Sequence, residues 1–307
     1  MINIKRCLKD ERLMKAMTGV TIEEFKKLTK DFRKELDKDN IKRYKQRKET
    51  NDKSRKSGGG QKGILDTIEK KLFFVLVYLK CYPTFDFMGL LFDLSRKNSK
   101  KRVDKLMPVL EKTLKSKLVL PKRKVSNMEE FLKICPEMKD VFMDGTERPH
   151  HRKKDYKKQK EMYSGKKKRH TTKNIVINDE SKRIRYLSPT MNGKEHDLSI
   201  FDKFFDSDTI PKNINFWLDL GFLGIDKYFP KMSFSMPKRK PKGKDQPKKV
   251  KEDNKIISGI RIVSEHAIGG IKRYRAITDV FRNKSLKFND LVMNISCGLW
   301  NYHLNQC

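Results

Sequence analysis

The stretch from Ser258 to Ile277, SGIRIVSEHAIGGIKRYRAI, constrains the fold most, because it divides its side chains into two opposite kinds of face. At about 100° per residue, an α-helix here collects an apolar face made of Val263, Ala267, Ile271, Tyr274 and Ile277. The opposite face carries Arg261, Glu265, Lys272 and Arg275. A solvated helix face with i,i+4 charge pairs would explain these charges. A carboxylate with cations before and after it also suits a metal ion bound to a phosphodiester.

The charge of the whole chain favours the second interpretation. The sequence has 73 Lys and Arg against 39 Asp and Glu, a formal net charge of +34. Such a chain attracts polyanions in a salt-dependent way, so we expect double-stranded DNA as the partner and no small-molecule substrate. A membrane surface is the competing partner, but the longest apolar run, Leu72 to Leu79, is too short to span a bilayer and is flanked by lysines. We therefore expect no membrane partner.

The cysteines and the N-terminal residues predict where the protein works. The five cysteines include no C-x-x-C pair, so neither a disulfide framework nor a zinc module is indicated. The N-terminal residues MINIKRCLKDERL show no apolar signal-peptide core. We expect a reduced, cytoplasmic protein.

Residues 1–62 are expected to hold N-terminal helices followed by a basic linker. Residues 1–36 predict two short helices, the second capped by Thr21 with Glu24 completing a capping box. From Lys38 to Lys62 the apolar residues almost disappear and the stretch ends in three glycines, which predicts a flexible loop.

Residues 63–120 predict a helix-turn-helix domain. A buried helix over 64–81 is followed by a short helix, a turn and a longer helix capped by Ser95. The first turns of this longer helix carry five basic residues, which we expect to contact DNA: Arg96, Lys97, Lys100, Lys101 and Arg102. A helical hairpin with a solvated basic face is the alternative.

Beyond Pro121 the pattern changes to short β-rich runs, so residues 121–307 predict a mixed-sheet domain and the whole chain an α+β fold. Strands are expected over 140–143, 170–178, 183–189 and 214–218. A helix is expected over 196–205, a basic Pro- and Lys-rich insertion over 227–255, and a closing helix, packed on the sheet, over 288–303.

Three carboxylates stand where metal-dependent chemistry would need them. Asp144 and Asp219 each follow a predicted strand, and Glu265 lies on the helix after them. Strand ends of one sheet point side chains into a common crevice. Converging acids repel one another unless a divalent cation lies among them, and oxygen ligands suit Mg²⁺ or Mn²⁺. Taken singly, Asp144 could instead form a turn before Gly145, and Asp219 could cap a helix or turn.

A series of motifs decides between these readings of the carboxylates. In order, DGTERP at 144, YSGKKKRHT at 163, GKEHD at 193, WLDLGFLG at 217, PKRKPKGK at 237 and NKIISGIRIVSEHAIGGIKRYR at 254 resemble the DDE transposases of insertion sequence family five, which are related to Harbinger elements. The resemblance covers roughly residues 64–304. It implies a helix-turn-helix domain followed by a ribonuclease-H-like domain with Asp144, Asp219 and Glu265 as the catalytic, metal-binding triad.

The resemblance also implies an activity. Two Mg²⁺ ions, replaceable by Mn²⁺, would support hydrolysis of the transposon ends. The freed 3′-hydroxyl would then join target DNA by transesterification, with a homodimer bound to both terminal inverted repeats. The alternatives are a domesticated DNA-binding regulator without catalysis and a nuclease without strand transfer. The spacing of Arg261, Glu265 and Lys272 also resembles the Tyr-Arg-Glu-Lys signature of a sister group, with Ser258 in place of the tyrosine.

Further residues are expected to contact DNA. From Arg148 to Lys173 there are twelve Lys and Arg against two acids, which is more positive charge than a surface without a binding partner needs. The expected contacts there are His151, Tyr163, Lys166, Lys167, Lys168 and Arg169, and in the insertion Lys238, Arg239 and Lys240. Arg261 and Lys272 would hold the transposon-end phosphates near the metals, and Arg275 is also expected to contact DNA. Asp197 is the rival second carboxylate, but its place before a helix favours a capping role.

Overall fold

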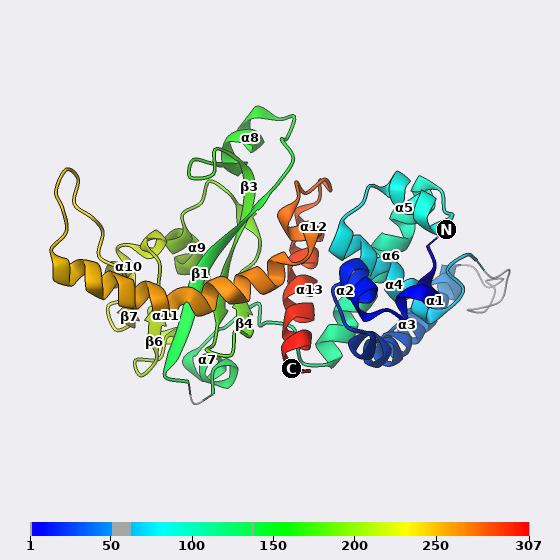
Figure 1. The fold of residues 1–307 in the computed structure, drawn as a ribbon, viewed down its shortest axis with the longest axis horizontal. Helices are drawn as coiled ribbons and strands as arrows, with labels where there is room; N and C mark the ends of the chain where they lie inside the picture. Colours follow the sequence, from blue (N-terminus) through cyan, green and yellow to red (C-terminus); the bar gives the residue numbers. More distant parts are fainter. Residues whose placement is uncertain (1, 51–62, 137, 307) are drawn as a thin grey trace. The chain divides into compact units, whose positions relative to one another are not determined.

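The computed structural model describes residues 2–50, 63–136 and 138–306 (Figure 1). The chain divides into two compact units. The first comprises Met1–Leu120, Arg273–Ala276 and Leu291–Cys307, and the second comprises Pro121–Lys272 and Ile277–Asp290. Among the described residues, no helix has the length and apolar character needed to cross a membrane.

The first unit begins with three helices, α1 (Ile4–Cys7), α2 (Glu11–Thr18) and α3 (Ile22–Thr50). The capping box before α3 is confirmed, because Thr21 N–H donates to Glu24 Oε2 at 2.7 Å and Glu24 N–H donates to Thr21 Oγ1 at 3.0 Å. The predicted linker is wrong over its first part, since α3 continues to Thr50. Good helix formers and i,i+4 ion pairs, such as Arg43 with Asp39, favour this extension. Residues 51–62 lie outside the described part of the chain.

The expected helix-turn-helix is present as α4 (Ile68–Cys81), α5 (Phe85–Phe92) and α6 (Arg96–Ser116). Ser95 caps α6 as predicted, accepting a hydrogen bond from Asn98 N–H at 3.2 Å. Gly89 makes the turn possible, because a Cβ at this position would overlap the carbonyl oxygen of Leu94. The predicted basic residues at the start of α6 are largely solvent-exposed, as a DNA-contacting surface requires.

The closing helix differs from the expected packing. It is α13 (Leu286–Leu304), and its residues from Leu291 onward belong to the first unit instead of packing on the sheet. Asn301 donates to the Val119 carbonyl at 2.8 Å, and the Tyr302 hydroxyl donates to the Glu24 carbonyl at 3.2 Å. The sequence predicted the apolar face of this helix, but not which unit buries it.

The second unit is built on a mixed sheet with the strand order β2-β3-β1-β6-β7, with β4 and β5 also paired to β3. The strands are β1 (Asp140–Pro149), β2 (Tyr163–Ser164), β3 (Arg169–Asn178), β4 (Ile184–Leu187), β5 (Met191–Asn192), β6 (Asn215–Trp217) and β7 (Ser233–Ser235). Strand β1 pairs antiparallel with β3 and parallel with β6, and β6 pairs parallel with β7. The predicted α+β class with a ribonuclease-H-like mixed sheet is therefore confirmed.

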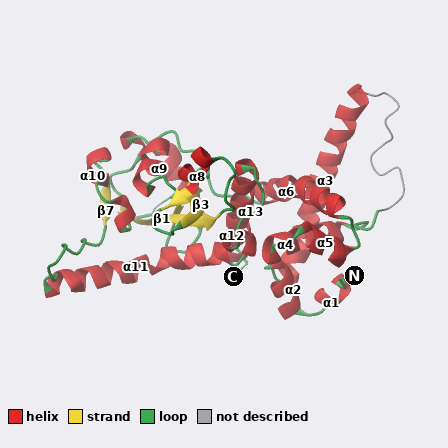
Figure 2. Cartoon of the chain, turned by 90° about the horizontal axis from the view of Figure 1, so that it is seen from above, coloured by secondary structure: helices red, strands yellow, loops and turns green. Residues whose placement is uncertain are grey.

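Helices cover this sheet and complete its core. They are α7 (Met128–Ile134), α8 (Tyr156–Met162), α9 (Asp197–Phe204), α10 (Ile225–Tyr228) and α11 (Lys248–Lys272), with short 3₁₀ turns at Ser207–Thr209 and Leu220–Phe222. Large apolar side chains such as Phe131, Phe201 and Phe216 are fully buried between the sheet and these helices. Helix α11 lies along the sheet and crosses β1 (Figures 1 and 2). The 227–255 insertion is partly regular, because it contains β7 and the start of α11.

We predict that Gly89→Ala destabilises the helix-turn-helix, since the new methyl group meets a backbone oxygen that cannot rotate away. The expected cost is about 1–3 kcal/mol, the range for overpacking, measured as a lower denaturant midpoint in a urea titration. Gly259→Ala on α11 is the matched control, because nothing lies within 4 Å of the added Cβ there. An equal loss in both variants would show that the close approach at Gly89 is not what requires the glycine.

Candidate active site

Asp144 and Asp219 occupy equivalent positions on two neighbouring parallel strands. The parallel pairing of β1 with β6 ends at Phe142 opposite Trp217, and each aspartate follows its strand partner by two residues. Neighbouring strands lie about 4.8 Å apart, so this register places the two carboxylates side by side. The sequence predicted that Asp144 would lie at the end of its strand. It lies instead in the middle of β1, because β1 continues to Pro149 in its pairing with β3. The pairing with β6, not the strand itself, ends near Asp144.

Asp197 is brought to the same place from the first residue of α9. An ideal Cβ on Gly145 would lie 2.6 Å from Asp197 Oδ1, and one on Gly221 would lie 2.6 Å from Asp197 Oδ2. Both glycines closely follow one of the paired aspartates, so they leave the space that this carboxylate fills. The expected capping role is wrong, because the N-cap of α9 is His196 and no side-chain capping bond forms. Gly145 and Gly221, which closely follow Asp144 and Asp219, were the feature of the sequence that could have indicated space for a third acid between the two aspartates.

Lys173 supplies a buried positive charge beside Asp197. Its ammonium lies 3.2 Å from Asp197 Oδ1 and 3.4 Å from Glu147 Oε1, and it donates to the Glu195 carbonyl at 2.8 Å. Strand β3 carries this lysine among otherwise buried residues, and its side chain is only 9% exposed. The lysine therefore orients Asp197 and compensates part of its charge.

The carboxylates lie close enough to perturb one another. Burial, the Asp219 charge and, to a smaller extent, the Asp197 charge raise the pKa of Asp144 to about 6, against the opposing effect of Arg261. Burial, with a further contribution from Asp219, also raises the pKa of Asp197, while Lys173 lowers it. This is the electrostatic signature of a site with more negative charge than the protein itself neutralises.

Helix α11 adds a cation and a free donor. Arg261 Nη2 lies 3.9 Å from Asp144 Oδ2, and the side chain is 13% exposed. Its Nε is buried and donates to none of the described residues. A buried guanidinium donor without an acceptor is costly unless a ligand supplies one. The arrangement suits an anion with oxygens on two sides, such as a phosphodiester.

Glu265 follows Arg261 by one helical turn, so it lies on the same face of α11. It is solvent-exposed and no hydrogen bond or ion pair joins it to the two aspartates in the described part of the chain. The apolar side of the helix is confirmed by the burial of Ala267 and Ile271. The expected charged face is shorter than predicted, because α11 ends at Lys272 and Arg275 begins the separate helix α12 (Arg275–Thr278).

The donor types fit a hard divalent cation, although the triad is not assembled. Within residues 2–50, 63–136 and 138–306 no group of three or more His, Cys, Asp or Glu side chains is arranged to hold a metal ion. Asp144 and Asp219 offer paired oxygens, and Asp197 offers an oxygen that makes an ion pair but no hydrogen bond. Carboxylate oxygens without Cys or His suit Mg²⁺ or Mn²⁺.

The other predicted DNA contacts divide into exposed and internally bonded residues. Tyr163, Lys166, Lys167, Lys168 and Arg169 are exposed around the β2–β3 turn, and Lys238, Arg239, Lys240 and Lys272 are exposed as well. His151 is the exception. Its Nδ1 makes a hydrogen bond of 3.1 Å with the Phe281 carbonyl, and its ring packs 4.4 Å from that of His150. These internal contacts favour a structural role for His151 over a phosphate contact.

Both the helix-turn-helix and the sheet domain have counterparts among known proteins. Residues 143–301 match the family model described as DDE superfamily endonuclease, and residues 65–116 match the one described as helix-turn-helix of DDE superfamily endonuclease. Over 254 residues the chain is 32% identical to a protein of Microchaete diplosiphon named as the probable transposase for insertion sequence element IS702. The match covers 82% of this chain and 86% of that protein. No solved structure matches the chain.

We predict that Asp144→Asn stabilises the protein at neutral pH without divalent cations. Because folding raises the pKa of Asp144 to about 6, the folded state keeps a proton that the unfolded state loses between about pH 4 and 6. This contribution to stability is present at lower pH and is lost as the pH rises through 6. Removing the charge should therefore increase the free energy of unfolding by roughly 1–3 kcal/mol at pH 7.5, and by almost nothing at pH 4.

Thermal unfolding in EDTA checks this prediction, with Asp202→Asn on the exposed side of α9 as the control. Added Mg²⁺ should raise the melting temperature of the parent and not that of Asp144→Asn, since only the parent gains charge neutralisation. A loss of stability in Asp144→Asn at pH 7.5 would contradict the proposed crowding of negative charge.

Proposed function

The chain belongs to the DDE superfamily endonucleases, and we propose that it is a DNA transposase that cuts and joins the ends of its own element. The observation that carries the proposal is the pair of register-matched aspartates beside a buried arginine donor without an acceptor. The order of motifs further favours insertion sequence family five.

The carboxylates are proposed to hold two Mg²⁺ ions, with Mn²⁺ able to replace them. Asp144 and Asp219 form the fixed part of the site, and Glu265 is proposed as the third ligand, reaching in from the next turn of α11 after Arg261. When bound, such ions lower the pKa of an attacking water or hydroxyl and stabilise the leaving oxygen. Asp197 stands between the two glycines as a further carboxylate that supports the pair.

The basic residues are proposed to position the DNA. Arg261 would donate its unused Nε–H to the scissile phosphate, and Lys272 would contact the backbone from the end of the same helix. The helix-turn-helix would place the start of α6 in the major groove of the terminal inverted repeats. The protein would then act on nucleoid DNA.

The proposed reaction proceeds by two direct displacements at phosphorus. Water attacks the phosphodiester at the transposon end, and the bond to the 3′-oxygen breaks to leave a free 3′-hydroxyl. This hydroxyl then attacks a phosphodiester of the target strand, whose own 3′-oxygen leaves. Both ends must be joined to one target, so a homodimer holding two ends is the proposed active form.

A supercoiled plasmid carrying the two element ends tests the function. We expect cleavage at the ends and joined products in Mg²⁺, none in EDTA, and neither product with Asp144→Ala. Glu265→Gln should lose cleavage and joining by at least about a hundredfold while end binding stays nearly unchanged. Binding by the parent without cutting in any metal would favour a non-catalytic regulator, and cutting without joining would favour a simple nuclease.

Asp197→Asn tests whether Asp197 or Glu265 is the third acid of the site. Asparagine fills the same space between Gly145 and Gly221 but removes the charge next to Lys173. As a supporting residue it should reduce cleavage about 10- to 100-fold and raise the Mg²⁺ concentration needed for half-maximal rate. If Glu265→Gln retained the parental rate while Asp197→Asn abolished cleavage, the triad would be Asp144, Asp219 and Asp197 instead.

A further inference from the structure

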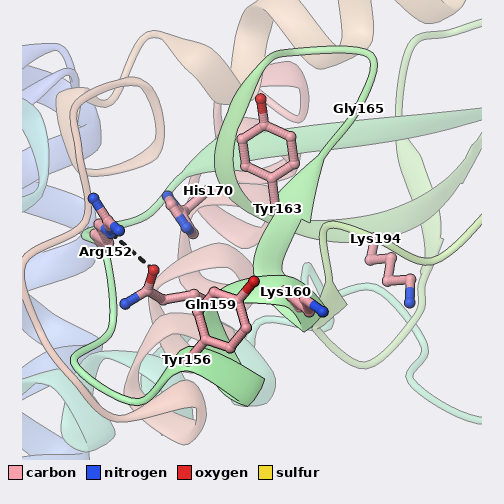
Figure 3. Close-up of a pocket in the computed structure, with 8 residues that line it drawn as sticks. All are labelled: Arg152, Tyr156, Gln159, Lys160, Tyr163, Gly165, His170 and Lys194. Carbon is pink, nitrogen blue, oxygen red and sulfur yellow. Dashed lines mark hydrogen bonds between the residues drawn. The ribbon is translucent and has the colours of Figure 1, made fainter.

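The second unit contains an open pocket away from the aspartates, with a volume of about 730 Å³ (Figure 3). Its walls come from the loop after β1, helix α8, strands β2 and β3, and the segment after β5. The side chains that give it its character are Arg152, Tyr156, Lys160, Tyr163, His170 and Lys194. The volume is that of a site for one small aromatic ligand or part of a larger one.

The aromatic side chains of this pocket are presented to solvent. Tyr156 is 67% exposed and Tyr163 is 42% exposed. The Tyr163 ring meets His170 edge-on at 5.7 Å, and Lys160 Nζ lies 5.0 Å from the centre of the Tyr156 ring. These contacts orient both rings and leave ring surface uncovered. An exposed aromatic surface fixed in this way suits stacking against another planar group.

The charged side chains select the kind of planar group. Arg152, Lys160 and Lys194 stand around the rings, and no acidic side chain lines the pocket in the described part of the chain. Arg152 Nε donates to Gln159 Oε1 at 2.9 Å, which fixes the guanidinium at the rim (Figure 3). Aromatic faces interleaved with cations are the combination that binds a base together with its flanking phosphates.

A tightly packed segment connects the pocket wall to Asp197. Gly193 contacts Thr171 so closely that a Cβ would overlap the Thr171 hydroxyl and lie 2.8 Å from its carbonyl oxygen. Lys194 N–H donates to the Glu161 carbonyl at 3.1 Å. Three residues later the same segment reaches Asp197, and three residues span at most about 11 Å. A DNA strand held at the aspartates can therefore reach the pocket within a few nucleotides.

We propose that this pocket binds an unpaired nucleobase of the DNA strand that passes the aspartates, a few nucleotides from the scissile phosphate. The base stacks on Tyr156 or Tyr163, while Lys160 and Lys194 contact its flanking phosphates. Opening the duplex end costs unstacking energy, and stacking on the tyrosines offsets that cost. The proposal rests on the function proposed above, since it takes DNA as the substrate.

Binding measured in EDTA tests the pocket without requiring catalysis. The probes are a blunt fluorescein-labelled duplex and the same duplex with a short single-stranded adenine extension, followed by anisotropy. The parent should prefer the extended probe by about tenfold, the effect of one stacked base. Tyr156→Ala combined with Tyr163→Ala should lose this preference and bind the blunt and extended probes equally well. The double Phe variant should keep the preference, because the ring face remains.

Tyr228→Ala on α10 is the matched control, since this tyrosine is 52% exposed and lies outside the pocket. A double alanine variant that keeps the preference for the extended probe overturns the proposal, and so does a parent that shows no preference. The Asp144→Ala protein separates the two proposals. If it retains the preference while the parent fails to cut plasmid, the pocket stands and the catalytic function falls. If the parent cuts the plasmid but shows no preference for the extended probe, the catalytic function stands and the pocket proposal falls.

Discussion

The repulsion between the carboxylates of Asp144 and Asp219 is the constraint around which the candidate site is arranged. Parallel pairing of β1 with β6 fixes the two acids at one level, and burial strengthens their interaction. The surrounding residues moderate this repulsion. Arg261 approaches from α11, and Lys173 binds the further acid Asp197. Each of these cations lies beside one acid, and we propose that a divalent cation between the acids compensates the remaining negative charge.

The sequence predicted the elements well because the local signals were strong. The capping box at Thr21, the cap at Ser95 and the strand over 170–178 depend on contacts within a few residues. The two aspartates could also be predicted, since each follows an apolar run. The position of Asp144 within its strand could not, because β1 is extended by pairing with β3 and this pairing is not local.

The place of Asp197 beside the two aspartates and the partner of α13 were predicted wrongly for the same physical reason. A helix start predicts a cap when only the neighbouring residues are considered, whereas the space beside Gly145 and Gly221 exists only in the folded sheet. The apolar face of α13 is evident from the sequence, but either unit could bury it. The part of α3 from Lys38 to Thr50 was predicted as a linker because its charged surface resembles a disordered stretch in composition.

Iron-directed cleavage of the protein tests the central claim, that Asp144 and Asp219 together hold a divalent cation. Fe²⁺ with ascorbate and peroxide generates hydroxyl radicals where the ion binds, and these cut the nearby backbone. The fragments should end near residues 144, 197 and 219, Mg²⁺ should suppress them, and Asp219→Asn should abolish them without unfolding the protein. Fragmentation elsewhere, or an unchanged pattern in Asp219→Asn, would contradict a metal site at the paired aspartates.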